Sequence, residues 1–168
     1  MPNLALFSQV FHVGATPPYI GILFRPNVVP RHTFENIIET GLFTINQVHP
    51  AIVEQAHQTS ARYEISEFEA TGLTEEYSEK YDVPLVAEAK IKAICELNER
   101  VDIQSNGTHL IIGAIKEMIY PEKIVESDGF MKLEKAGTLT VSGLDSYHTT
   151  EQLMRLAYAK PETELDKA

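Results

Sequence analysis

The sequence predicts a mainly β fold, a barrel or sandwich with helices at its periphery. Short runs of apolar and β-branched residues, separated by turn residues, recur from the start of the chain to about residue 142. Short strands spaced in this way are typical of all-β barrels and sandwiches. One run, Leu110–Ile115, is almost continuously apolar and therefore indicates a central strand buried on both faces. Helical patterns occur in three places.

Six strands are expected, and they cover residues 4–13, 19–24, 42–46, 91–97, 108–120 and 138–142. Pro17-Pro18 lies between the first two strands and requires a turn or a strand edge there. Asn106-Gly107 lies between the fourth and fifth strands and favours a tight turn, although with Thr108 it also matches a glycosylation sequon.

The first two helices have clear boundary residues. One is expected from Thr33 to about Thr40, with Gly41 ending it in the left-handed conformation. The next begins at Pro50, a favoured first-turn residue, and continues to His57. The polar connection that follows, residues 59–82, is too long for a plain linker in a compact domain, so we expect it to cover part of the barrel.

A third helix is expected at the C-terminus. Thr149 can cap it, Leu153, Leu156 and Ala157 form one apolar stripe, and Pro161 ends it. Residues 162–168 are polar and are expected to fray. We therefore expect one domain, in which residues 1–148 form the barrel and residues 149–168 its C-terminal helix and tail.

Composition excludes several classes of function. Of the 168 residues, 43% are hydrophobic and 23% are charged, which is typical of a soluble globular protein. The net charge of −10 argues against a nucleic-acid partner. No run is long enough to span a membrane and no signal peptide is evident, so we expect a cytoplasmic protein. The single cysteine, Cys95, is expected to be a buried, inert thiol.

The start of the first helix carries groups that can hold an anion. A helix N-terminus has free amide donors and a partial positive charge. Around it lie two cations, a histidine, a hydroxyl and an amide, namely Arg25, Arg31, His32, Thr33 and Asn36. A plain helix cap with a solvated arginine explains the helix start equally well. Arg25, at the end of the preceding strand, favours the anion site.

The first predicted strand adds two polar side chains. Asn3 and Ser8 can form hydrogen bonds with the edge of a planar heterocycle, although taken alone they are ordinary polar residues of a strand. Together with the helix start, they suggest a phosphorylated cofactor that lies along a sheet.

The order of short motifs resembles a known family, the flavin reductase-like proteins with the FMN-binding split barrel. The segments that carry the resemblance span almost the whole chain and cover residues 3–8, 15–18, 31–37, 41–46, 59–61, 66–73 and 143–147. Members of the family commonly carry one or two strands before the segment that matches Asn3–Ser8, and this chain begins there. Three explanations stay open: the protein is a natural short form, its barrel is completed differently, or the sequence lacks the native N-terminus. A missing strand would leave an exposed sheet edge beside that segment.

The resemblance implies a split β-barrel homodimer that binds FMN near the subunit interface. It places the segment with Asn3, Leu4, Ala5, Phe7 and Ser8 along the flavin ring, the segment from Arg31 to Asn36 at the phosphate, and the loop with Thr59 and Ser60 near the cofactor. It also places the region of Tyr147 and His148 near a nicotinamide, and His12 flanks the flavin segment.

The implied reaction is electron transfer from NAD(P)H through FMN to free flavin or another small-molecule acceptor. Hydride transfer to a flavin needs no acid or base from the protein, so no catalytic side chain is expected. Two alternatives stay open: an FMN-binding electron-transfer protein without significant nicotinamide oxidation, and a flavin-free binding protein on the same scaffold.

Other sites have weaker support. No Gly-x-Gly-x-x-Gly segment follows a strand, which excludes a Rossmann nicotinamide site. Glu54–His57 resembles half of a carboxylate di-iron motif, but such a site needs a second copy in a four-helix bundle. The histidines lack zinc-binding spacing, and His109 on the central strand is interpreted as structural.

Overall fold

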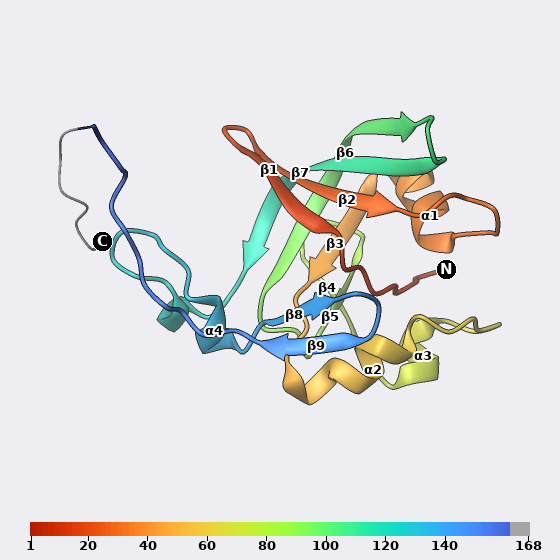
Figure 1. The fold of residues 1–168 in the computed structure, drawn as a ribbon. Coiled ribbons are helices and arrows are strands. Elements are labelled where there is room, and N and C mark those ends of the chain that lie inside the picture. Colours follow the sequence, from red (N-terminus) through yellow and green to blue (C-terminus); the bar gives the residue numbers. More distant parts are fainter. Residues whose placement is uncertain (162–168) are drawn as a thin grey trace.

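The fold is organised around one curved antiparallel sheet. The computed structural model describes residues 1–161. The sheet has five strands in the order β1-β2-β7-β6-β3 (Figure 1). Its strands are β1 (Val10–Ala15), β2 (Pro18–Phe24), β3 (Leu42–Asn46), β6 (Lys92–Ile103) and β7 (Thr108–Ile119). The central position predicted for this strand is confirmed, but its predicted burial on both faces is wrong, because along β7 only Ile111 and Gly113, which lie on the same face, are buried.

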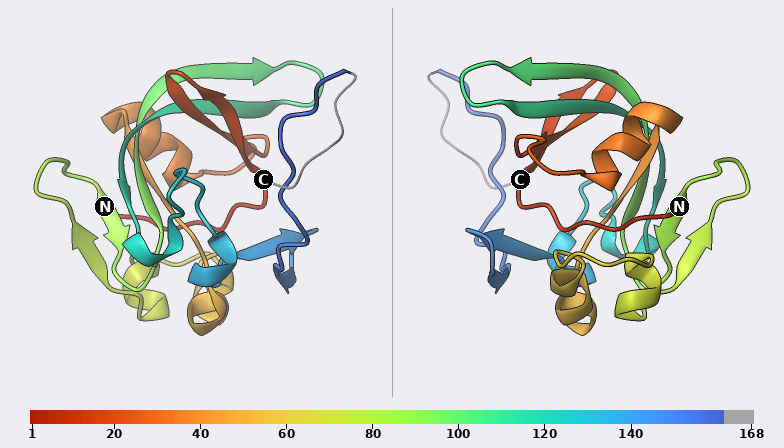
Figure 2. Two further views of the ribbon diagram at one scale, coloured as in Figure 1. Left: turned by 90° about the vertical axis from the view of Figure 1, so that its left-hand side faces the viewer. Right: turned by 90° about the vertical axis from the view of Figure 1, so that its right-hand side faces the viewer.

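Smaller elements lie below this sheet and at its ends. Two hairpins are formed by β4 (Glu75–Tyr77) with β5 (Pro84–Val86) and by β8 (Leu139–Ser142) with β9 (Ser146–Thr149). The helical elements are α1 (His32–Thr40), η1 (Pro50–Ile52), α2 (Val53–Gln58), α3 (Glu67–Thr71), η2 (Glu122–Ile124) and α4 (Leu133–Ala136). In both views of Figure 2, residues 1–9 run between the large sheet and the layer that contains α2 and α3.

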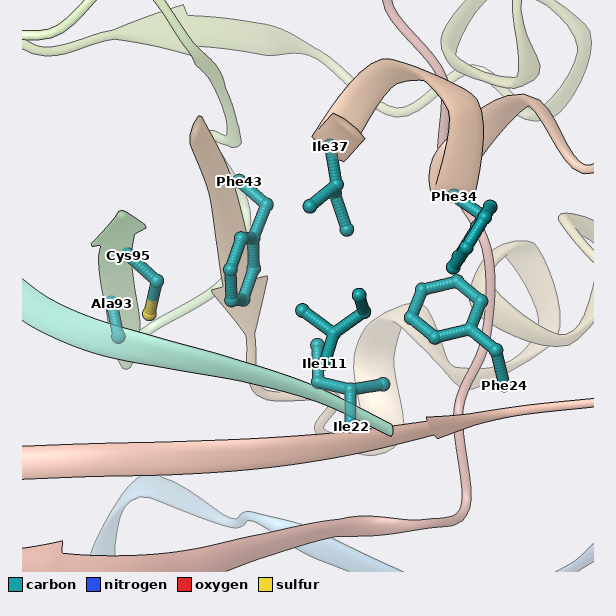
Figure 3. Close-up of a cluster of buried hydrophobic side chains, with 8 residues drawn as sticks. All are labelled: Ile22, Phe24, Phe34, Ile37, Phe43, Ala93, Cys95 and Ile111. Atoms are coloured by element: carbon teal, nitrogen blue, oxygen red, sulfur yellow. The ribbon is translucent and has the colours of Figure 1, made fainter. Parts of the chain in front are cut away.

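The main core lies between α1 and the concave face of the sheet. Phe34 and Ile37 of α1 are buried against strand residues, which are Ile22, Phe24, Phe43, Ala93, Cys95 and Ile111 (Figure 3). The helix ends as predicted: Gly41 has φ 72°, and its amide donates to the Ile37 carbonyl. The predicted burial of Cys95 is also confirmed, and burial raises the pKa of its thiol to about 12.

The turn predicted at Asn106-Gly107 joins β6 and β7. Gly107 has φ 72°, and the Asn106 side chain accepts hydrogen bonds from the Thr108 amide at 3.1 Å and hydroxyl at 2.7 Å. Near this end of the hairpin, His109 Nδ1 lies 2.6 Å from Asp102 Oδ1, and its ring packs on Phe34 with centroids 4.9 Å apart. These contacts agree with the structural interpretation of His109.

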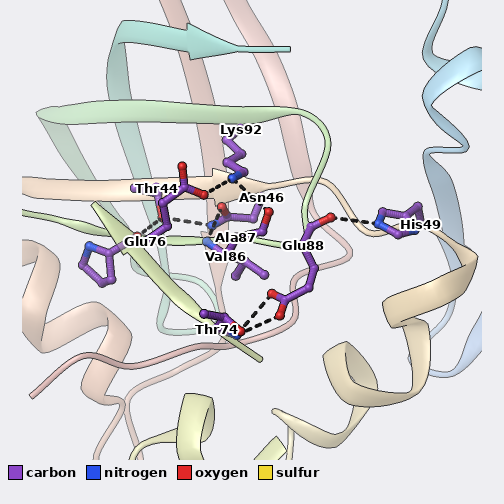
Figure 4. Close-up of polar contacts among 10 residues, drawn as sticks. Thr44, Asn46, His49, Thr74, Glu76, Val86, Ala87, Glu88 and Lys92 are labelled. Carbon is purple, nitrogen blue, oxygen red and sulfur yellow. Dashed lines mark hydrogen bonds and ion pairs between the residues drawn. The ribbon is translucent and has the colours of Figure 1, made fainter. Parts of the chain in front are cut away.

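The long connection 59–82 contains α3 and β4, which the sequence did not predict. β4 pairs with β5, and β5 is fixed to β3 by polar contacts (Figure 4). Thr44 donates to the Pro84 carbonyl at 2.7 Å, and the Val86 amide donates to Asn46 Oδ1 at 2.9 Å. The buried Lys92 ammonium reaches Glu76 at 2.5 Å. The connection therefore covers one edge of the sheet.

The strand predicted over residues 4–13 is wrong in its first half. Pairing begins at Val10, and the preceding residues are extended without a strand partner, apart from a bond of 3.0 Å from the Leu23 amide to the Gln9 carbonyl. Leu4 packs against the cluster of Ile52 and Phe68, whereas Phe7 packs on the main core. Because its apolar side chains are held below the sheet, the segment cannot continue the β1–β2 ladder.

The predicted C-terminal helix is also wrong. Residues 150–161 contain no helix, and Ser146–Thr149, immediately before them, form β9. Leu153 and Leu156 of the predicted apolar stripe are 88% and 48% exposed, so the stripe is not buried as one helix face. A short helix without tertiary packing is only marginally stable in water, which explains why the predicted helix does not form. The predicted frayed tail, residues 162–168, lies outside the described residues. Within residues 1–161, no helix combines the length and apolar character needed to cross a membrane.

Candidate functional site

A cavity of about 1020 Å³ lies between the large sheet and the layer below it. Its lining comes from the N-terminal segment (residues 1–9), from β1, β2 and β3, from α1 and α2, and from the β8–β9 hairpin. Ligand cavities commonly measure about 300–1,000 Å³, so this one has room for a large ligand.

The N-terminal segment forms one wall. Five residues of the flavin-ring prediction line the cavity, namely Asn3, Leu4, Ala5, Phe7 and Ser8. The segment is anchored at both ends of this stretch: Asn36 donates to the Met1 carbonyl at 3.2 Å, and the Phe7 ring meets Phe24 with centroids 4.7 Å apart. Backbone that has no strand partner on the cavity side can bond to a ligand.

Asn3 is more deeply engaged in the protein than the sequence indicated. Its amide nitrogen donates to Glu67 Oε2 at 3.0 Å, and its amide oxygen accepts a hydrogen bond from the Thr33 hydroxyl. The Leu4 amide donates to the same Glu67 oxygen at 3.1 Å. Glu67 is buried, and sequence reasoning missed its role. Its segment belonged to the family resemblance, but nothing local marked its carboxylate.

The start of α1 contributes two of its predicted residues to the cavity. Thr33 and Asn36 line it, whereas Arg25, Arg31 and His32 do not. Arg31 is the residue before the helix, and its Nε donates to the Pro26 carbonyl at 3.2 Å. Thr33 does not cap the helix, because its hydroxyl donates to Asn3. These three residues therefore adjoin the lining in sequence only: Arg31 and His32 directly precede Thr33, and Arg25 follows β2.

The two candidates after α2 differ. Thr59 is buried and lines the cavity, but its hydroxyl donates to the Ala56 carbonyl at 2.7 Å. Ser60 is exposed and lies outside the lining. The loop meets the cavity through Thr59.

The β8–β9 hairpin reaches the cavity through Tyr147. The Tyr147 hydroxyl lies 2.7 Å from His57 Nδ1, and the two rings meet edge to face at 5.7 Å. Burial and the charge of Asp145 raise the pKa of Tyr147 above its ordinary value. His148 instead bonds to Ser142 at 2.8 Å within its own hairpin and lies outside the lining. His12 lines the cavity from β1.

His57 is a second residue that sequence reasoning missed. The sequence marks it only as part of the Glu54–His57 segment, which resembles half of a di-iron motif. Among residues 1–161, no group of three or more histidine, cysteine or acidic side chains is placed to hold a metal ion. His57 acts instead as the partner of Tyr147, which links α2 to the hairpin.

The lining is neutral to acidic. It includes Glu39 and Asp82, and no lysine or arginine is among the described residues that form it. An uncharged ring suits such walls, whereas an anionic group would be repelled from them. Arg31 and His32 directly precede Thr33 of the lining, just as Lys116 follows Ile115 and Lys132 precedes Leu133. The lining itself thus suits a planar, uncharged ring.

Solved structures share this architecture. A structure described as a flavin reductase with a split barrel domain, from Shewanella frigidimarina NCIMB 400, is 49% identical, with 94% of this chain and 79% of that chain covered and a TM-score of 0.89. Component B of nitrilotriacetate monooxygenase from Bacillus cereus is 26% identical, with coverages of 92% and 79% and a TM-score of 0.81. The 2-nitrobenzoate 2-nitroreductase of Pseudomonas fluorescens is 26% identical, with coverages of 96% and 80% and a TM-score of 0.79.

The fold is therefore a split β-barrel, as the sequence predicted, and it belongs to a class of proteins in flavin redox chemistry. Residues 1–145 match the family described as flavin reductase like domain. The chain belongs to this family.

Proposed function

We propose that the protein binds FMN in the cavity and transfers electrons from NAD(P)H through it to free flavin or another acceptor. The observation that carries this proposal is the convergence of three separate segments on one cavity. The N-terminal segment, the start of α1 with Thr33 and Asn36, and the end of α2 with Thr59 all line it. The family resemblance implies a flavin-binding role for each of these segments.

The residues present fit such a cofactor. The N-terminal segment offers backbone donors and acceptors, with the apolar Leu4 and Phe7 side chains, for a planar ring. Arg31, the residue before α1, would supply positive charge to a phosphate at the amide groups of the helix start, and Arg25, which follows β2, is the second candidate cation. FMN, when bound, supplies hydride acceptance and onward electron transfer. The chain's own residues bind and orient the ring and exclude water from it.

The acceptor differs among relatives. One similar structure is component B of a nitrilotriacetate monooxygenase, and another is a 2-nitrobenzoate 2-nitroreductase. These activities belong to those two proteins. For this chain we propose a neutral, planar acceptor or free flavin, because Glu39 and Asp82 line the cavity and no lysine or arginine of the described residues does. A cytoplasmic location accompanies the proposal, since NAD(P)H is the donor.

An electron-transfer protein with little nicotinamide oxidation is the second candidate. The specific observation in its favour is the same lining, which includes Glu39 and Asp82. A nicotinamide dinucleotide carries a pyrophosphate, and the described lining offers this anion no lysine or arginine.

Anaerobic mixing separates the two candidates. The purified protein, loaded with FMN, is expected to be yellow and to lose its flavin absorbance when NADH or NADPH is added. Because nicotinamide binding relies on stacking, the rate is expected to saturate only at high donor concentration. Bleaching by dithionite but by neither nicotinamide would favour the electron-transfer protein. Failure to bind FMN at all would contradict both.

A further inference from the structure

Glu67 is a buried carboxylate that lies outside the cavity lining. It occupies the first turn of α3 and is 8% exposed. A carboxylate is costly to bury unless N–H groups satisfy it, and hydrogen bonds to a charged group are among the strong ones. Both donors to its Oε2 atom, the Asn3 amide at 3.0 Å and the Leu4 backbone amide at 3.1 Å, belong to the N-terminal segment.

The same end of the segment has two further anchors. Asn3 Oδ1 accepts a hydrogen bond from Thr33, and Asn36 donates to the Met1 carbonyl. Residues 1–4 are thus held between α1 and α3. No strand ladder holds the described residues before Val10, and the nearest main-chain bond joins Gln9 to Leu23. The position of the cavity wall formed by residues 5–8 therefore depends on side-chain anchors.

We propose that Glu67 is a positioning residue that holds the N-terminal segment over the cavity and pre-orders the wall against which the flavin lies. This inference rests on the proposed function. Glu67 acts through Asn3 and Leu4 without contacting the ligand. Without Glu67, the segment loses the two hydrogen bonds to Oε2. The free-energy cost of ordering the segment then reduces the affinity for the ligand. The loss concerns the ring-facing wall, so FMN and riboflavin are affected equally.

Three variants test the proposal. Glu67→Ala removes the acceptor, whereas Glu67→Gln keeps one carbonyl oxygen that can accept both N–H groups. Glu69→Ala is the matched control, because Glu69 is an exposed glutamate on the same helix. Hydrogen exchange is measured on each flavin-free protein, and FMN and riboflavin are titrated into each. Amides of β6 and β7 report whether the fold is intact.

In Glu67→Ala, the amides of residues 4–8 are expected to exchange about tenfold faster, and the Kd values of both flavins to rise by about the same factor. Glu67→Gln is expected to keep the exchange rates and the flavin Kd values close to those of the unmodified protein, and Glu69→Ala is expected to change neither quantity. Unchanged exchange of residues 4–8, or unchanged flavin affinity with intact β6 and β7, would overturn the proposal. If the unmodified protein binds neither flavin, the proposed function fails, and the exchange data alone decide whether Glu67 anchors the segment.

Discussion

The Thr33 side chain forms a hydrogen bond within the protein, although it also lines the cavity. Its hydroxyl donates to Asn3, although the sequence suggested either a helix cap or a phosphate contact. Among the described residues, the Arg31 side chain forms one hydrogen bond, from its Nε atom to the Pro26 carbonyl in the loop before α1. At the scale of the residue, these two side chains are expected to have different effects on ligand binding.

Arg31→Ala is expected to weaken FMN and to leave riboflavin, which lacks the phosphate, nearly unchanged. A lost charge-assisted contact costs on the order of 1.5–3 kcal/mol, which exceeds a tenfold change in Kd. Thr33→Val is expected to weaken both ligands, because it removes an anchor of the N-terminal segment, with Thr33→Ser as the control. Fluorescence titrations measure the Kd values of FMN and riboflavin for the unmodified protein and for the three variants. Equal losses of both ligands in Arg31→Ala would place the phosphate elsewhere.

At the scale of the element, β7 passes close to core side chains of β6, its neighbour in the sheet, and of β3, which lies beyond β6. A Cβ atom added to Gly113 would lie 2.3 Å from the Phe43 ring and 3.2 Å from the Cys95 Cβ. These neighbours are buried, so they cannot move aside freely. The glycine is required here by a close approach of the strand to an aromatic ring.

Gly113→Ala is therefore expected to lower the free energy of unfolding by about 1–3 kcal/mol through overpacking. Gly14→Ala in β1 is the matched control, because the nearest atom to its added Cβ is the Pro17 carbonyl oxygen at 3.6 Å. Urea titrations followed by circular dichroism compare the two. Equal stability of both variants would mean that the Phe43 ring can yield without cost.

The β8–β9 hairpin is linked to α2 by the contact between Tyr147 and His57. The sequence assigned Tyr147 and His148 jointly to nicotinamide placement, but only Tyr147 faces the cavity. The hydrogen bond of His148 to Ser142 keeps its ring within the hairpin. The two neighbours are therefore expected to contribute unequally.

Tyr147→Phe is expected to raise the NAD(P)H concentration at half-saturation by about two- to tenfold, the loss expected for one hydrogen bond. FMN content is expected to stay the same, since the α1 end is untouched. His148→Ala is the comparison and is expected to have the smaller effect. Stopped-flow reduction of the FMN-loaded variants measures both. A larger effect of His148→Ala would restore the sequence-based assignment.

At the scale of the whole molecule, β1 leaves an apolar edge. It is the outer strand of the sheet, and Phe11 and Val13 are 43% and 42% exposed. Apolar surface of this kind is commonly buried against a second, symmetric copy. The family resemblance implies a homodimer, and we propose that β1 contributes to its interface.

Light scattering at micromolar concentration is expected to give the mass of a dimer. Val13→Lys is expected to shift the protein toward the monomer, because a charge would be buried at the interface. Val28→Lys is the matched control, since Val28 is 83% exposed in the loop before α1. A well-folded monomer of the unmodified protein would contradict the proposal.

What the sequence by itself determined is the pattern of the sheet and of its turns. The positions of β2, β3, β7 and β8, and the end of α1 at Gly41, followed from local periodicity and turn residues. These features depend on neighbours in the chain, so they can be predicted without knowledge of distant contacts. The order of the motifs also identified the family.

The tertiary structure alone decided the path of the N-terminal segment, the absence of a helix in residues 150–161 and the choice of cavity-facing side chains. Asn3 meets Glu67 from 64 residues away, and Tyr147 meets His57 from 90 residues away. Leu153 and Leu156 have the spacing of a helical apolar stripe, yet they are 88% and 48% exposed and no helix forms there. An apolar stripe forms a stable helix only where the fold provides a surface for it to pack against. A polar side chain likewise anchors a segment only where the fold places a hydrogen-bond partner beside it.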